Sequence, residues 1–165
     1  MAKTDLTAQR VRELLDYSPN SGLLTWRVTL PHCKHKPGDV AGCVATDGYV
    51  VVGVDCRYYK AHRLIWLHVH GDWPAQCVDH MNGNRSDNRL CNLRSACKSM
   101  NVQNVHGASK RSQSGLLGVR KYGKKWRSAI MVDGRIQHLG TFEAPELAQN
   151  AYLEMKRKHH VGFLG

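Results

Sequence analysis

An aspartate and a histidine stand side by side at positions 79 and 80, in a segment rich in glycine and asparagine. Asp79 offers the hard carboxylate oxygen that Mg²⁺ prefers. On extended backbone the side chain of His80 points the other way, and its imidazole can accept a proton from water near neutral pH. Asn101, on an expected helix, adds a neutral amide oxygen. Two oxygen ligands and one base are the minimum equipment for metal-assisted hydrolysis of a phosphodiester.

Other side chains near this pair have more than one interpretation. Asn104 and His106 lie about one helical turn beyond Asn101 and are alternatives to it as the second ligand, although we favour Asn101. His62 either packs at the start of a helix or contacts the site. The nearby arginines could clamp phosphates, but arginines on polar loops are more often solvated or paired. These arginines are Arg85, Arg89 and Arg94.

Hydrophobic spacing and turn residues predict the elements that position these side chains. Helices are expected over residues 8–17, 61–69 and 95–104, and strands over residues 23–28, 49–54 and 58–60. Thr7 and Ser95 are the expected caps of the first and third helices. Residues 77–93 are predicted to be extended and rich in turns. Asp79 and His80 therefore lie on extended backbone, ahead of the helix that carries Asn101.

The last third of the chain has a different pattern. Residues 106–117 are poor in apolar side chains and predict a linker. Three short strands are expected from residues 118, 125 and 135, with a hairpin turn at Asp133-Gly134, and a helix begins near Pro145. These elements predict a small three-stranded antiparallel sheet packed on one helix. The fold class is therefore α+β, in two modules.

The charge of the chain favours a polyanionic partner. Lys and Arg number 24 against 13 Asp and Glu, a formal charge of +11. Residues 1–108 hold 13 basic and 9 acidic side chains, whereas residues 109–165 hold 11 and 4 in about half that length. We expect double-stranded DNA as the partner and no small-molecule substrate. No run approaches the roughly 18 apolar residues of a membrane span, so we expect a soluble, cytoplasmic protein.

Six cysteines occur without any C-x-x-C pair, which argues against a disulfide framework and a structural zinc site. We interpret them as mostly small buried hydrophobic residues. One segment, His32-Cys33-Lys34-His35 with Cys43 downstream, could in principle supply zinc ligands, but the paired spacing of zinc sites is missing.

The central part of the chain resembles the HNH nucleases, specifically the phage and intron-type homing endonucleases built on a ββα-metal fold. The similarity rests on "AHRLIW" from Ala61, "VDHMNGNRSDNRLCNLR" from Val78 and "NVQN" from Asn101. It implies that Asp79 and Asn101 bind one divalent ion, Mg²⁺ or alternatively Mn²⁺, and that His80 is the general base. It also implies that Asn92 helps to orient His80. Many members have His where this chain has Asn101.

The segment "GVRKYGKKWRSAIMVDGRIQHLGTFEAPELAQNAYLEM", from Gly118 to Met155, resembles the DNA-binding domain of plant ethylene-response factors. In that family the sheet lies in the major groove. The resemblance points to Arg120, Trp126, Arg127 and Arg135 as DNA-binding residues, with His138 where the family commonly has Trp. Independently of the family, Lys121 and Lys125 fall on the same short sheet, where basic and aromatic side chains together suit phosphate and base-edge contacts.

These patterns predict a metal-dependent DNA endonuclease from a phage or mobile element. We expect an HNH nuclease domain at residues 1–105 with its catalytic core at about 61–105, a linker at 106–117 and a DNA-binding domain at 118–165. One site cuts one strand per binding event, so a monomer or weak dimer is expected. The alternative is a non-catalytic, sequence-specific DNA-binding regulator that keeps the HNH fold.

Overall fold

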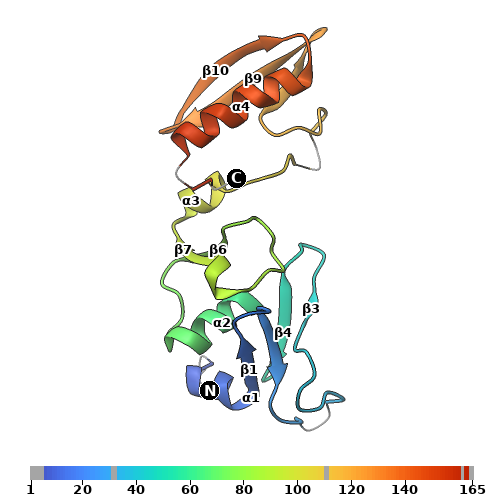
Figure 1. Ribbon diagram of the computed structural model, residues 1–165, viewed down its shortest axis with the longest axis vertical. Coiled ribbons are helices and arrows are strands. Elements are labelled where there is room, and N and C mark those ends of the chain that lie inside the picture. Colours follow the sequence, from blue (N-terminus) through green and yellow to red (C-terminus); the bar gives the residue numbers. More distant parts are fainter. Residues whose placement is uncertain (1–5, 31–32, 110–111, 161, 164–165) are drawn as a thin grey trace. The chain divides into compact units, whose positions relative to one another are not determined.

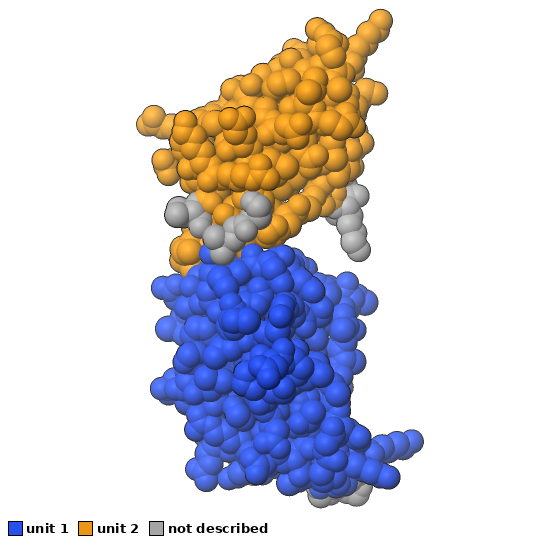
Figure 2. Space-filling view, in the orientation of Figure 1, with its two compact units in different colours: residues 1–96 blue, residues 97–165 orange. Residues whose placement is uncertain are grey.

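The computed structural model of the protein describes residues 6–30, 33–109, 112–160 and 162–163. The chain divides into two compact units, residues 1–96 and 97–165 (Figure 2). The division lies after Ala96 and not in the linker expected at residues 106–117. The helix that carries Asn101 therefore belongs to the second unit.

The first unit begins with a helix that is shorter than the sequence predicts. Helix α1 spans Ala8–Leu14, and the Thr7 side chain caps it by accepting a hydrogen bond from the Arg10 backbone N at 3.2 Å. The chain is already extended at Leu15, where strand β1 (Leu15–Ser18) starts and pairs with β2 (Leu23–Trp26). The predicted helix over residues 8–17 is wrong beyond Leu14, because pairing with Trp26 buries Leu15 completely.

A three-stranded antiparallel sheet and a second helix follow. The sheet order is β3 (Cys43–Val44), β4 (Val50–Val54) and β5 (Arg57–Lys60). Asp55 and Cys56 join β4 to β5 with positive φ angles of 46° and 60°, as a tight two-residue hairpin turn requires. Helix α2 (Ala61–His70) ends at Gly71, whose φ of 86° lets its N–H bond to the Leu67 carbonyl. The expected hairpin and the expected helix are confirmed.

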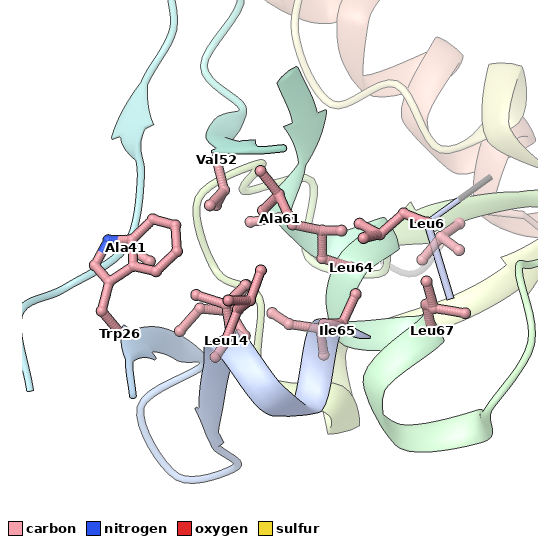
Figure 3. Packing of buried hydrophobic residues seen from close by; sticks show 14 of the residues in the cluster. Leu6, Leu14, Trp26, Ala41, Val52, Ala61, Leu64, Ile65 and Leu67 are labelled. Carbon is pink, nitrogen blue, oxygen red and sulfur yellow. The ribbon is translucent and has the colours of Figure 1, made fainter. Parts of the chain in front are cut away.

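The core of the first unit gathers around α2. The side chains of Leu64 and Ile65 are fully buried and converge with those of Leu14 and Trp26 from α1 and β2 (Figure 3). Further members come from β4 and from the strand that carries the Asp79-His80 pair; they include Val52, Val54 and Val78. Packing of α2 therefore fixes both the first half of the chain and the backbone of the candidate site.

Replacement of Ile65 by alanine is expected to lower the free energy of unfolding of this unit by about 2–5 kcal/mol, because it leaves a cavity in a closely packed core. Urea unfolding followed by circular dichroism measures the change. Val69→Ala, on the same helix at a side chain that is 39% exposed, is the control and should change stability by less than about 1 kcal/mol. Equal losses for the two variants would contradict the assigned core.

The rest of the first unit is a two-stranded antiparallel ladder. Strand β6 (Cys77–His80) pairs with β7 (Leu93–Ala96), and a short 3₁₀ helix, η1 (Leu90–Asn92), leads into β7. The register places Asp79 opposite Arg94 and His80 opposite Leu93. Ser95, the expected cap of the next helix, lies in β7.

The second unit starts with helix α3 (Lys98–Gln103), whose N-cap position is Cys97. A three-stranded antiparallel sheet follows in the order β10 (Arg135–Phe142), β9 (Lys125–Val132), β8 (Val119–Tyr122). Helix α4 (Pro145–His159) lies along this sheet, mainly against β9 (Figure 1). The predicted sheet packed on one helix is confirmed as an arrangement of elements.

All six cysteines are free and exposed, so the interpretation of them as buried residues is wrong. Their positions on strand edges and turns, such as Cys56 in the hairpin turn, keep the thiols outside the packed faces. The suggested zinc ligand His32 lies outside the described residues. Within the described ranges, no helix has the length and apolar character needed to cross a membrane.

Candidate active site

His80 ends strand β6 and is almost completely buried, with 3% of its surface exposed. Its ring lies between two others: the His62 ring from α2, edge-on at a centroid distance of 5.0 Å, and the Tyr49 ring at 5.9 Å. Burial lowers the pKa of His80, which leaves the ring neutral at pH 7. A neutral imidazole is the form that can accept a proton.

Asn88 contacts His80 directly. The Asn88 Oδ1 atom lies 3.0 Å from His80 Nε2, and the Asn88 Nδ2 atom donates to the Ser86 carbonyl at 3.3 Å. The second bond orients the amide so that Oδ1, which can only accept, faces the ring. Nε2 of the neutral imidazole is therefore the donor, and Nδ1 holds the lone pair. The sequence had suggested Asn88 only as a turn former.

Asn92 has a different place in the loop that joins β6 to η1, residues 81–89, here named the site loop. Its Oδ1 accepts from the Asn82 backbone N at 3.0 Å, and its Nδ2 donates to the Asp87 carbonyl at 2.8 Å. These two bonds tie both ends of the site loop together. The side chain that pairs with His80 Nε2 is Asn88, and Asn92 shapes the loop from which Asn88 projects.

Asp87 is the second organiser of the site loop. Its carboxylate accepts from Asn82 Nδ2 at 2.8 Å and from the Arg89 guanidinium at 2.8 and 2.6 Å. The hydrogen bonds from Arg89 lower the pKa of Asp87 to about 2. Arg89 is thus paired within the loop. Arg85 donates to the Asp47 carbonyl at 2.8 Å and lies over the Tyr49 ring.

Asp79 lies next to His80 in sequence and, because strand side chains alternate, on the opposite face of β6. Its carboxylate is 8% exposed and accepts from two nitrogens of Arg94, from Nη2 at 2.9 Å and from Nε at 3.2 Å. Arg94 is the cross-strand partner of Asp79 on β7 and is itself only 16% exposed. The ion pair is thus largely removed from solvent. The sequence gave no sign that these two residues would pair.

His62 is the aromatic neighbour whose role the sequence left open. It is 4% exposed, and its Nδ1 is among the buried atoms of the described residues that lack a hydrogen-bond partner. Burial, followed by the nearby His80, lowers the pKa of His62 to about 3. His62 is therefore a neutral side wall for the His80 ring, delivered by the first turn of α2. The spacing of α2 shows which face is buried, but not which strand the face contacts.

The other predicted ligand lies in the second unit. Asn101 is half-buried on α3. Asn104, the first alternative, is 5% exposed and its Oδ1 is 3.0 Å from the ring of His106, the second alternative. That mutual contact occupies both alternatives and favours Asn101 as a ligand. Among the described residues, no three His, Cys, Asp or Glu side chains gather where they could hold an ion.

The sheet of the second unit has two different faces. On β9 the buried side chains of Ser128, Ile130 and Val132 alternate with more exposed ones and face α4. Cross-strand partners point to the same side of a sheet. Arg120 pairs with Arg127, Tyr122 with Lys125, and His138 with Ala129, all on the side away from α4. This open face is defined by Arg120, Tyr122, Lys125, Arg127 and His138.

The remaining predicted DNA contacts lie on the α4 side. Lys121 pairs with Trp126, and Arg135 pairs with the buried Val132. Trp126 is half-buried and stands opposite Phe142, which places it among the packed residues. The structure therefore brings Arg120, Lys125, Arg127 and His138 together and separates them from Lys121, Trp126 and Arg135. On the open face the Arg127 guanidinium lies 3.7 Å from the Tyr122 ring centroid.

Comparison with known proteins identifies the central segment. Residues 59–103 match the model of the HNH endonuclease family, a stretch that runs from β5 through α3 and contains Asp79, His80, Asn92 and Asn101. No curated protein and no solved structure matches the chain. The match supports a nuclease or DNA-binding function. Nucleases of the HNH family act on DNA and generally use a divalent metal ion.

Proposed function

We propose that this protein is a metal-dependent DNA endonuclease of the homing type, in which His80 activates the water that attacks a phosphodiester. The observation that carries the proposal is the buried, neutral His80 ring, held by Asn88 and adjacent in sequence to Asp79, inside the segment that matches the HNH family. A general base must be unprotonated and fixed in orientation, and both conditions are met here.

The proposed metal ligands are Asp79 and Asn101. One carboxylate and one amide are hard oxygen donors of the kind that Mg²⁺ and Mn²⁺ accept, and a set of two leaves positions for water and phosphate oxygens. The donor set therefore fits the ion. When bound, a divalent ion would neutralise charge on the phosphate and on the departing sugar oxygen. The chain order of β6, β7 and α3 supports a ββα-metal module.

The residues of the chain then have distinct tasks. His80 takes a proton from water at Nδ1, while Asn88 holds Nε2 and prevents the ring from turning. Asn92 and Asp87 keep the site loop in the shape that presents Asn88. His62 and Tyr49 enclose the ring and exclude bulk water from its flat sides. This division of labour resembles other sites in which a second residue orients the base.

Target binding is assigned to the second unit. Arg120 and Arg127 lie side by side on the open face of the sheet, with Lys125 and His138 beside them. Two guanidinium groups on a face that no other element of this sheet covers suit phosphate and base-edge contacts. The +7 charge of residues 109–165 supports attraction to DNA. A monomer or weak dimer that nicks DNA, encoded by a phage or mobile element, completes the proposal.

The direct test is a plasmid assay. Supercoiled plasmid incubated with the protein and Mg²⁺ or Mn²⁺ is expected to become open-circular, and EDTA should abolish the conversion. Genomic DNA of the presumed host is a second substrate, since a homing enzyme requires its target sequence. Absence of cutting on both DNAs under either metal, together with retained DNA binding, would replace the proposal by the non-catalytic regulator.

Asn88→Ala tests how the base is held. The change removes the acceptor from His80 Nε2, and cleavage is expected to fall about 10- to 100-fold, the usual effect of losing a group that orients a catalytic residue. Gel-based cleavage rates at saturating Mg²⁺ measure the effect. Asn84→Ala is the matched control, because Asn84 lies on the same loop and its Oδ1 contacts only Ser86 among the printed bonds. An equal loss for both variants would assign the effect to loop shape alone.

A further inference from the structure

The Asp79–Arg94 pair gives the proposed metal site a cation of its own. Both hydrogen bonds from the guanidinium reach the same carboxylate oxygen, Oδ2, at 2.9 and 3.2 Å. The two side chains are 8% and 16% exposed, whereas the other Arg–Asp pairs of this unit involve at least one side chain that is 42% exposed or more. Solvent therefore weakens this pair least.

Arg94 and a divalent ion compete for the same carboxylate. A cation that binds Asp79 must either displace the guanidinium from Oδ2 or share the carboxylate with it. Sharing is unfavourable because two like charges would lie within a few ångströms at a poorly hydrated position. Displacement frees a guanidinium beside the point where the substrate phosphate must lie. Arginine is well suited to phosphate, since its planar fork can donate two parallel hydrogen bonds.

We propose that Arg94 is an exchangeable cation: it pairs with Asp79 before metal binds, and it moves to the DNA phosphate when metal takes its place. Arg94 then neutralises the carboxylate in the resting protein and the phosphate in the working one. This inference rests on the proposed function of Asp79. It differs from a structural role, because a residue that merely holds Asp79 in place would help metal binding and cleavage alike.

The opposite signs provide the test. Arg94→Gln is expected to bind Mn²⁺ at least threefold more tightly than the wild-type protein, measured on the full chain without DNA by the loss of the free-Mn²⁺ electron paramagnetic resonance signal. The same variant is expected to cleave plasmid about tenfold or more slowly at saturating Mn²⁺. Arg10→Gln is the matched control, since Arg10 forms a comparable pair with Asp55 away from the site. It should change neither quantity.

Two further variants keep the outcomes separate. If Arg94→Gln does not fold, Arg94→Lys keeps one cation without the fork, and its Mn²⁺ affinity should lie at or above that of the wild type with slower cleavage. Unchanged or weaker Mn²⁺ binding in the folded variants would overturn the exchange. Asp79→Asn tests the underlying site: if it binds Mn²⁺ as well as the wild type does, or if neither binds, the proposed ligand fails and the inference fails with it.

Discussion

His80→Ala is expected to lower the rate of DNA cleavage by about 10²- to 10⁴-fold, the range that a general base contributes in enzymes. The reason lies in the surroundings of the ring. His80 is buried, neutral and fixed through Nε2, so removal of the imidazole takes away the one proton acceptor that the site loop holds in a defined orientation. Single-turnover cleavage of plasmid at saturating Mg²⁺ measures this loss without interference from product release.

Two controls make the His80 result specific. His70→Ala removes an exposed histidine at the end of α2 and should leave the rate unchanged. Mn²⁺ affinity of His80→Ala should stay close to that of the wild type, because His80 is assigned to the water and not to the ion. Cleavage by His80→Ala at the wild-type rate would remove His80 as the base. A variant that has lost its melting transition would instead need His80→Asn, which keeps a polar side chain of smaller size.

Much of the architecture follows from local pattern in the sequence. Helix α2 and the β4–β5 hairpin occur where the apolar spacing and the turn residues place them, because Gly71 and the two-residue turn at Asp55 fix their ends. The end of α1 was mispredicted for a non-local reason. Residues 15–17 would continue the helical spacing, but the pairing of Leu15 with Trp26 offers them a ladder that no local pattern reveals.

The candidate site divides in the same way. Asp79 and His80 are apparent from residue type alone, and their alternation follows from extended backbone. Their partners are set by tertiary contacts: Asn88 reaches His80 across eight residues, Arg94 reaches Asp79 across a strand pair, and His62 arrives from α2. Several asparagines and arginines surround the pair in sequence. Only the register of β6 with β7 and the shape of the site loop decide which of them makes contact.

The two faces of the second sheet permit a charge-matched experiment on target binding. Arg120→Ala with Arg127→Ala removes two cations from the open face. Lys121→Ala with Arg135→Ala removes the same charge from the side that faces α4. All four are backbone partners in regular strands, so the two double variants should perturb the strands to a similar extent. What differs is the direction in which the lost charge points.

The open-face double variant is expected to bind a 30-base-pair duplex about 10- to 100-fold more weakly near 0.15 M salt, since each lost arginine contact costs about 1–3 kcal/mol at most and the two are neighbours. The slope of log affinity against log salt should also fall by about 2 if both arginines contact phosphates. Fluorescence anisotropy in EDTA measures both quantities without cleavage. The α4-side variant should keep most of the affinity, because its side chains are directed away from the open face. If that variant lost as much affinity as the first, long-range charge would explain binding, and the open face would have no special role.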